Sequence, residues 1–341
     1  MKLTLGTGAA GNSLTGHYPP KIAIVAGSTA GPDLQTKLVA TNLFSLVDVV
    51  NVSTVAVPTV AQMRAYDGIV AWTVTTNTDK AFGDNLAEYL EAGGGVVLAD
   101  YQSQETGNAG LKGRYQADYT LSTQIAAADW VKTKVTLGTI HEPNSPLLTD
   151  VSTFGYQGTT PSHLPASSFS KNNPIVVASY SDGTPAVVRG VINGHTVVEI
   201  NGYGSSSVER ASNGWDPSTD GARLFANALL FTIPPPSITT ARRLDFEGEQ
   251  VYSTSTAKTV TYVNASSAPK TIAALNVIGT HIGDFVQTPE SGLPATLQPG
   301  ETLVVNVRFS PSGTGLRAAT LAATVTGTNA PATTLLTGTG N

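Results

Sequence analysis

Three consecutive prolines divide this 341-residue chain into two parts with different sequence patterns. Pro234, Pro235 and Pro236 can continue neither a helix nor a central strand, and a proline run favours a stiff, extended spacer. A chain of this length also exceeds the size at which a single hydrophobic core usually stops growing. We therefore predict two domains, 21–231 and 241–341, joined by a proline-rich linker at 232–240.

In the N-terminal part, short apolar runs alternate with helical patterns. The run Ile22–Ala26 ends in a turn of small residues, which is typical of a buried parallel strand. Further strands are predicted at 47–52, 67–72 and 96–99. Helices are predicted at 34–46, over a short turn at 60–66, and at 84–92 before three glycines. This alternation predicts an α/β domain of the flavodoxin type, with a doubly wound, mostly parallel sheet.

Residues 102–172 are rich in Gly, Ser and Asn and show no regular period, so insertions are expected there. Order returns in three predicted strands at 175–180, 186–191 and 195–200. Asn193-Gly194 lies between the last two and is a strong hairpin signal. An amphipathic helix at 220–231 closes the domain. Residues 1–20 end in Pro19-Pro20 and favour an extended N-terminal arm.

The C-terminal part shows strand patterns without a helical period. Strands are predicted at 258–263 and 302–309, and turns separate them from similar short runs. About 100 residues of this kind predict an all-β, immunoglobulin-like sandwich.

Composition excludes several classes of function. Only 13% of residues are charged, the net charge is -5, and the pair Arg242-Arg243 is the longest basic cluster, which argues against nucleic-acid binding. The chain has no cysteine, so it can form no disulfide, thiolate metal site or cysteine nucleophile. Its apolar runs are far shorter than the roughly 20 residues of a membrane helix. No signal peptide is visible at the start of the sequence, which indicates either that export is not used or that a leader was removed.

Two segments carry a resemblance to a known superfamily. With Ala65–Val70 and Leu90–Leu98, the first domain resembles the class I glutamine-amidotransferase-like proteins, in the ThuA-like variety. In catalytic members a cysteine, activated by a histidine, follows the strand that corresponds to Val96–Ala99. Here that turn reads Asp100-Tyr101-Gln102-Ser103. The resemblance therefore implies a pseudoenzyme domain without a catalytic residue or a cofactor.

The sequence gives less support to a substitute catalytic residue or a metal site. Ser103 is a conceivable substitute nucleophile, served by His141, His163 or His195, but no Gly-x-Ser-x-Gly elbow surrounds it. His195 follows Asn-Gly and is expected to be a partly exposed turn residue. No metal-ligand spacing links His17, His141, His163 and His281. Turn bonds or helix capping are the expected roles of Asp182, Asp216 and Asp220.

The loop Gly27–Gly31 joins a strand to a helix, which invites a phosphate-binding interpretation. It matches neither the dinucleotide fingerprint nor the Walker pattern, so a tight turn is the preferred interpretation. Ligands of doubly wound sheets bind at the carboxyl ends of the strands. A pocket there would be lined by Ser28, Thr29, Trp72, Thr73, Asp100 and Tyr101.

The second domain resembles the Hydin-type immunoglobulin-like domains, including the choice-of-anchor modules of bacterial surface proteins. The segments that carry the resemblance are Leu244–Val251, Gly283–Phe285, Leu297–Thr302, Val307–Pro311 and Leu336–Gly340. The resemblance implies a domain that scaffolds and docks without catalysing a reaction.

Together these features favour a non-catalytic structural or adhesive module of a cell-surface, extracellular or phage-particle assembly. Its expected partners are other protein subunits, including copies of itself, with a glycan as a further ligand. Neither nucleic acid nor membrane insertion is expected. The alternatives are a carbohydrate-related binding protein that uses the strand-end pocket and a serine-dependent hydrolase.

Overall fold

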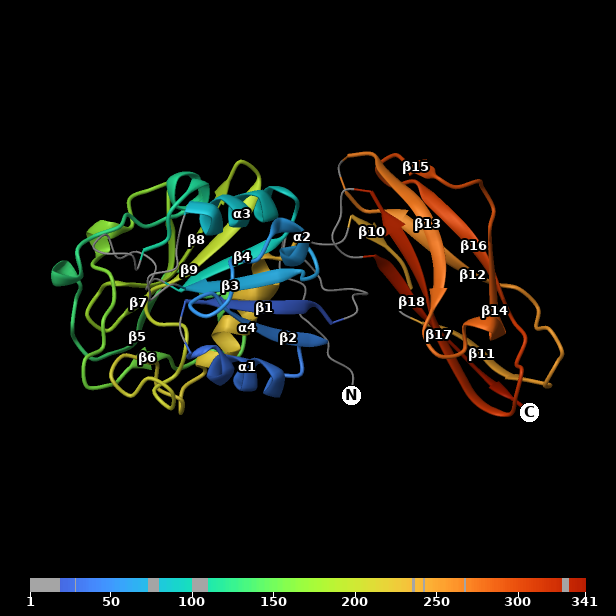
Figure 1. Ribbon diagram of the computed structural model, residues 1–341, viewed down its shortest axis with the longest axis horizontal. Coiled ribbons are helices and arrows are strands. Elements are labelled where there is room, and N and C mark those ends of the chain that lie inside the picture. Colours follow the sequence, from blue (N-terminus) through green and yellow to red (C-terminus); the bar gives the residue numbers. More distant parts are fainter. Residues whose placement is uncertain are drawn as a thin grey trace. The chain divides into compact units, whose positions relative to one another are not determined.

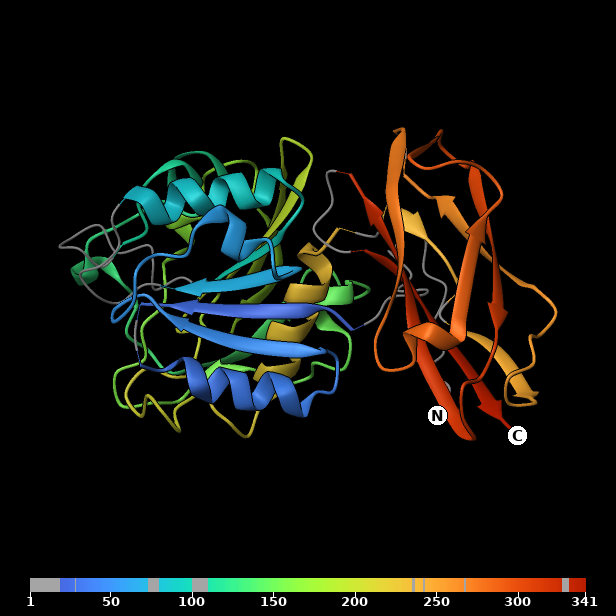
Figure 2. The same cartoon turned by 45° about the vertical axis from the view of Figure 1, so that its right-hand side comes forward.

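The chain forms two compact units that divide between Pro234 and Pro235. This computed structural model describes residues 19–27, 29–72, 80–99, 110–234, 237–241, 243–266, 268–326 and 331–341. Each unit has hydrophobic core clusters of its own, within 22–233 in the first and 238–336 in the second. Figures 1 and 2 show the first unit in blue to yellow and the second in orange to red.

A nine-stranded sheet organises the first unit, in the order β2-β1-β3-β4-β9-β8-β7-β5-β6. Its strands are β1 Lys21–Ala26, β2 Leu46–Asn51, β3 Gly68–Trp72, β4 Gly95–Ala99, β5 Val135–Ile140, β6 Gly155–Tyr156, β7 Ile175–Tyr180, β8 Pro185–Ile192 and β9 His195–Ile200. The strands from β2 to β9 in this order pair in parallel. From β9 onward, every pair is antiparallel.

The doubly wound, flavodoxin-like fold class expected from the sequence is therefore wrong, because the sheet is mixed. A parallel connection needs a crossover of a dozen or more residues, whereas a two-residue turn makes neighbours antiparallel. Asn193 and Gly194 make such a turn between β8 and β9, with φ values of 51° and 83°, and Asp182–Thr184 joins β7 to β8. Residues 110–174 contain only short helical turns between strands, so they supply no crossover helix.

Helices cover both faces of this sheet (Figure 2). They are α1 Gly31–Ala40, α2 Val60–Met63, α3 Lys80–Glu91 and α4 Gly221–Thr232. Leu34 and Leu38 of α1 share a core cluster with Leu224 and Phe225 of α4, while α3 packs into the cluster on the opposite face. Among the described residues, none of the helices has the length and apolarity needed to span a membrane.

The helix expected over 34–46 ends earlier, at Ala40. Thr41 donates its hydroxyl to the Leu38 carbonyl at 2.6 Å, and Asn42 takes the left-handed conformation with φ 56°. Asparagine tolerates this conformation better than most residues, so the helix stops there. Among the described residues, the other helical turns are Tyr115–Tyr119, Ala127–Asp129, Pro146–Leu148, Ala166–Ser168 and Ile282–Asp284.

The second unit is a sandwich of two sheets, ordered β10-β12-β16-β14 and β11-β18-β17-β13-β15. Its strands are β10 Ile238–Thr239, β11 Arg243–Glu249, β12 Lys258–Asn264, β13 Lys270–Ile278, β14 Phe285–Pro289, β15 Ala295–Leu297, β16 Thr302–Phe309, β17 Gly315–Val325 and β18 Ala332–Gly340. Alternate side chains of both sheets meet in one core. In it, the rings of Phe285 and Phe309 stack 4.9 Å apart. The all-β sandwich is observed, and its immunoglobulin-like character stays a prediction.

Candidate functional site

The carboxyl ends of the parallel strands are where the sequence predicted a pocket. Thr29 is exposed in the turn after β1, whereas Trp72 at the end of β3 is fully buried. The Trp72 ring packs 6.0 Å from the ring of Tyr203. A Cβ on Gly204 would lie 2.4 Å from the same indole, so Gly204 leaves the room that Trp72 fills. Ser28, Thr73, Asp100 and Tyr101, the other predicted pocket residues, lie outside the described residues, as does Ser103.

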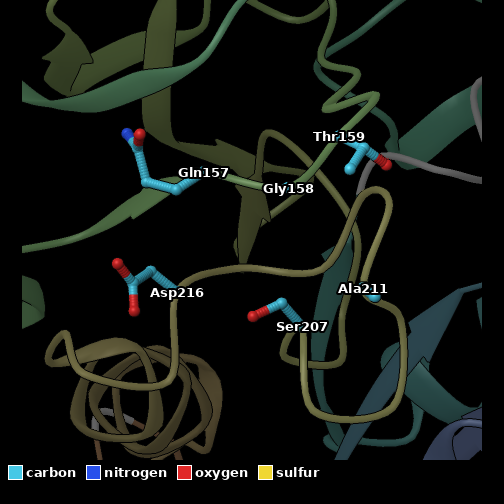
Figure 3. Close-up of a pocket in the computed structure, with 6 residues that line it drawn as sticks. All are labelled: Gln157, Gly158, Thr159, Ser207, Ala211 and Asp216. Carbon is cyan, nitrogen blue, oxygen red and sulfur yellow. The ribbon is translucent and has the colours of Figure 1, made fainter.

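A cavity of about 290 Å³ lies between two loops of the first unit. One loop, residues 157–165, follows β6, and the other, residues 201–220, joins β9 to α4. The lining residues are Gln157, Gly158, Thr159, Ser207, Ala211 and Asp216 (Figure 3). We call this cavity the loop pocket. It belongs to the segment in which the sequence showed no period and to the turn before α4.

Backbone hydrogen bonds hold the two loops of the pocket together. Thr160 donates its amide to the Ser212 carbonyl at 2.8 Å, and Asp216 donates its amide to the Gly155 carbonyl at 2.9 Å. Gly158 lies so close to the other loop that a Cβ would be 2.3 Å from the Ser212 oxygen. The pocket wall thus requires a glycine at this position.

The loop from β9 to α4 is also tied to α1. The Ser206 amide donates to Asp33 Oδ2 at 2.7 Å, and the Ser206 hydroxyl donates to Oδ1 of the same carboxylate at 3.1 Å. Lys37, which pairs with Asp33, lies 5.7 Å from the Trp215 ring centroid. The position of the pocket is therefore fixed to the rigid sheet and its helix.

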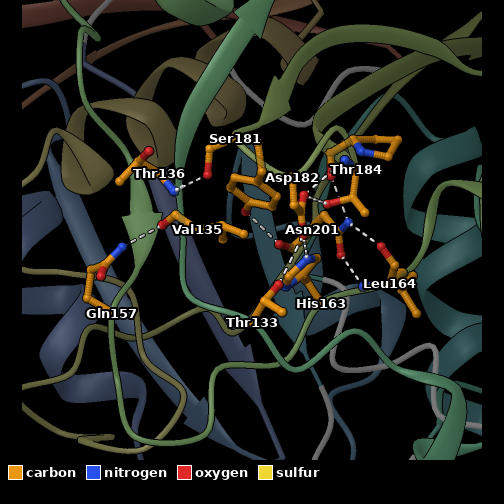
Figure 4. A network of polar contacts seen from close by, with 12 residues as sticks. Thr133, Val135, Thr136, Gln157, His163, Leu164, Ser181, Asp182, Thr184 and Asn201 are labelled. Carbon is orange, nitrogen blue, oxygen red and sulfur yellow. Dashed lines mark hydrogen bonds and ion pairs between the residues drawn. The ribbon is translucent and has the colours of Figure 1, made fainter.

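A polar cluster anchors the pocket loop of residues 157–165 (Figure 4). His163 is fully buried, and its Nε2 lies 2.8 Å from Asp182 Oδ2 in the turn between β7 and β8. Asn201 holds the next residue, because its side chain accepts from the Leu164 amide at 2.7 Å and donates to the Leu164 carbonyl at 2.9 Å. Gln157 of the pocket donates to the Val135 carbonyl at 2.9 Å.

Burial lowers the pKa of His163, because the imidazolium form loses its hydration, and the Asp182 carboxylate opposes this shift only in part. Burial alone would raise the pKa of Asp182, but hydrogen bonds from Thr184 and His163 outweigh it and lower that pKa. Within the described chain, His163 Nδ1 is buried without a hydrogen-bond partner. The neutral ring with Nε2–H facing the carboxylate fits this arrangement.

The three histidines that could activate a nucleophile have different surroundings and different contacts. His163 joins the buried cluster, and His141 Nε2 lies 2.9 Å from the Ser179 hydroxyl near the sheet edge. His195 begins β9, half-buried, with its ring edge-on to Tyr119 at 6.3 Å. In the part of the chain that the structure describes, no group of three His, Cys, Asp or Glu side chains could hold a metal ion.

The acidic turn residues split into two kinds. Asp182 and Asp216 each accept from a backbone amide two residues later, at 3.0 Å and 2.9 Å, which are turn bonds as expected. Asp220 precedes α4 but makes no side-chain cap bond to it. Its carboxylate instead accepts from the amides and hydroxyls of Ser152 and Thr153. Gln157, Thr159 and Ser207 were not predicted as site residues, because no pattern in the sequence indicates that the two loops come together.

Comparisons with known proteins add structural neighbours only. No family model and no curated protein matches the chain. A ThuA-like protein from Parabacteroides merdae has 11% identity and a TM-score of 0.44, over 63% of this chain and 90% of that protein. The PapD-like domain 7 of human CEP192 has 16% identity and a TM-score of 0.23, over 31% of this chain and 85% of that domain.

A third neighbour is the VesB protease of Vibrio cholerae, with 12% identity and a TM-score of 0.26. The match covers 48% of this chain and 44% of that protease, so this chain spans less than half the length of VesB. All three TM-scores lie below 0.5, and these likenesses assign neither a fold nor an activity to this chain.

Proposed function

We propose that this protein is a non-catalytic structural or adhesive module that docks onto neighbouring copies of itself through its β-sandwich. The assembly would lie on a cell surface, outside the cell or on a virion. As part of the same proposal, the first unit is a ThuA-like domain without its catalytic cysteine, and the second unit is a Hydin-type immunoglobulin-like domain.

The observation that supports docking is a group of exposed apolar side chains on the outer face of the five-stranded sheet. Ile278 of β13 and Leu335 of β18 both lie opposite Thr320 of β17, so the three side chains form one row across the sheet. Leu316 lies on the same face, four residues along β17, because side chains alternate with a period of two. We call Ile278, Leu316, Thr320 and Leu335 the outer-face patch. The exposed fractions of Ile278, Leu316 and Leu335 are 49%, 70% and 42%.

The charges beside this patch favour a second copy as its partner. Arg243 of β11 lies opposite Leu335 of β18 and forms an ion pair with Asp245 at 2.9 Å. The two charges offset each other, so two identical faces can meet without strong repulsion. A two-fold symmetric contact needs such a self-complementary surface. Neighbouring exposed apolar side chains also mark interaction surfaces more often than scattered ones do.

A photo-crosslinking amino acid at Leu316 tests this contact directly. The expected product is a covalent dimer in which the crosslink joins Leu316 of one copy to the sandwich of the other. The matched control carries the crosslinker at Val191, which is 64% exposed on β8 of the first unit. Crosslinks of equal yield at both positions, or none at Leu316, would contradict the proposal.

Carbohydrate-related binding is the second candidate function. The strand-end pocket stays a prediction, because Ser28, Thr73, Asp100 and Tyr101 lie outside the described residues. Among the described residues, the polar loop pocket favours this candidate.

A further inference from the structure

The loop pocket combines four polar side chains with a single formal charge. Figure 3 shows the Ser207 hydroxyl turned toward the side of Asp216, with Gln157 across the opening from both. Thr159 adds a second hydroxyl at the other end of the lining. Only Asp216 is charged, so the pocket has a negative charge and no basic group among its lining residues.

Several of these polar atoms keep hydrogen-bonding capacity for a ligand. Ser218 donates its amide and hydroxyl to Asp216 Oδ1 at 2.9 Å and 2.7 Å. Gln157 Nε2 donates to the Val135 carbonyl, so Oε1 is the atom of this side-chain amide that can accept a hydrogen bond. Within the described chain, Asp216 Oδ2, Gln157 Oε1 and the Ser207 hydroxyl make no hydrogen bond to protein. The pocket thus offers two acceptor oxygens and one hydroxyl that can donate or accept.

This set of groups selects against ions. Asp216 would repel an anion, and a divalent cation prefers several carboxylate and carbonyl oxygens rather than one carboxylate. Neighbouring hydroxyl groups of a polyol can donate to the two acceptors and accept from Ser207 at the same time. At about 290 Å³, the cavity is at the lower end of small-molecule pockets, so it suits one ring rather than an extended chain.

We propose that the loop pocket binds a neutral polyhydroxyl ligand of the size of one sugar ring. Asp216 and Gln157 accept from adjacent hydroxyls of the ligand, and Ser207 orients it. The two loops are pinned to each other and to α1 before any ligand arrives, so binding costs little ordering of the protein. This proposal is independent of docking through the outer-face patch, and the two can fail separately.

Saturation-transfer NMR on the full chain with a panel of neutral monosaccharides and polyols tests the proposal, followed by titration calorimetry on the best binder. Asp216→Asn keeps one acceptor oxygen but loses the charge, and Ser207→Ala loses the hydroxyl. Each variant is expected to weaken binding by roughly ten-fold, the size of one lost hydrogen bond. Thr36→Ala, which removes an exposed hydroxyl from α1, should bind like the unmodified protein.

Two outcomes would overturn the proposal. One is the absence of saturation transfer from every neutral sugar and polyol up to the limit of solubility, with the far-ultraviolet circular dichroism showing folded protein. The other is sugar binding that both pocket variants leave unchanged, because the ligand would then lie elsewhere. Transfer from acetate that exceeds transfer from the sugars would also contradict the assignment of a neutral ligand.

Discussion

His163 is a residue whose role follows from its surroundings rather than from its type. A histidine in this sequence is a candidate base, ligand or turn residue, and its neighbours in the chain do not decide among these. The structure buries its ring against Tyr180 at 5.4 Å and pairs it with Asp182. It thereby anchors the loop that carries Gln157 and Thr159 into the pocket. The sequence could not predict this pairing, because 19 residues separate the two partners.

The lowered pKa of His163 predicts a loss of stability in mild acid. The folded state holds the ring neutral, so its contribution is fully present above the unfolded pKa of about 6.5. Stability then falls with pH toward the lowered folded pKa, because the unfolded state binds the proton more readily. The slope from this residue is at most about 1.4 kcal/mol per pH unit. Asp182 adds its own loss only below its unfolded pKa of about 3.9, outside this window.

Urea denaturation of the isolated first unit or the full chain across this pH range measures the effect. His163→Gln should be less stable at neutral pH and should show a shallower slope between neutral pH and mild acid. His141→Gln is the matched control, because it removes a histidine of the same unit outside the buried cluster. An equal slope in the unmodified protein and the His163 variant would show that protonation of this ring does not set the acid sensitivity.

Individual elements of the first unit were well predicted, while their arrangement was not. The apolar runs predicted β1, β3 and β4 to within one residue at each end. Periodicity reports which faces of a segment are buried, so it locates strands and helices. It does not report the direction in which distant strands pair. The Asn193-Gly194 turn already required β8 and β9 to be antiparallel, but the alternation in the first half of the chain favoured a doubly wound, mostly parallel sheet.

Close approaches between elements leave almost no sequence signal. Gly83 in α3 is one example, because a Cβ at this position would lie 1.7 Å from the Lys112 carbonyl oxygen. The neighbouring Asp84 accepts from the Arg114 amide at 2.8 Å and holds the same segment against the helix. An isolated glycine within a helix normally weakens it by about 1 kcal/mol relative to alanine. The tertiary contact reverses the expected effect of a substitution.

Gly83→Ala is therefore expected to destabilise the first unit by roughly 1–3 kcal/mol, despite its higher helix propensity. Thermal and urea unfolding monitored by circular dichroism measure the change. Gly283→Ala is the matched control, because no atom lies within 4 Å of a Cβ at that position. It should alter the unfolding of the second unit by no more than about 0.5 kcal/mol. A Gly83→Ala protein as stable as the unmodified chain would contradict the close approach.

At the scale of the whole molecule, the hydrophobic core clusters of the described residues separate at the proline run in the sequence, with two clusters before it and one after it. The prolines at 234–236 were the sequence feature that predicted the boundary, because a proline run interrupts both helices and central strands. The cores of the first unit include both faces of its sheet, and that of the second lies between its two sheets. Neither set of core residues draws on the other unit.

Each unit should consequently fold when expressed alone. Residues 19–234 and residues 237–341 are each expected to show one cooperative thermal transition, and the full chain should show both. Differential scanning calorimetry of the three proteins compares these transitions. A second unit that lacks a cooperative transition, or a full chain that unfolds only as one unit with a much higher melting temperature, would contradict the independence of the two cores.

Sedimentation velocity over a range of protein concentrations tests self-association through the outer-face patch. We expect the full chain to shift toward a dimer as concentration rises. Leu316→Lys, which places a charge at the most exposed patch position, should stay monomeric. Val191→Lys, with its charge on the first unit, should associate like the unmodified chain. A full chain that remains monomeric at every concentration, or a Leu316→Lys variant that dimerises normally, would contradict it.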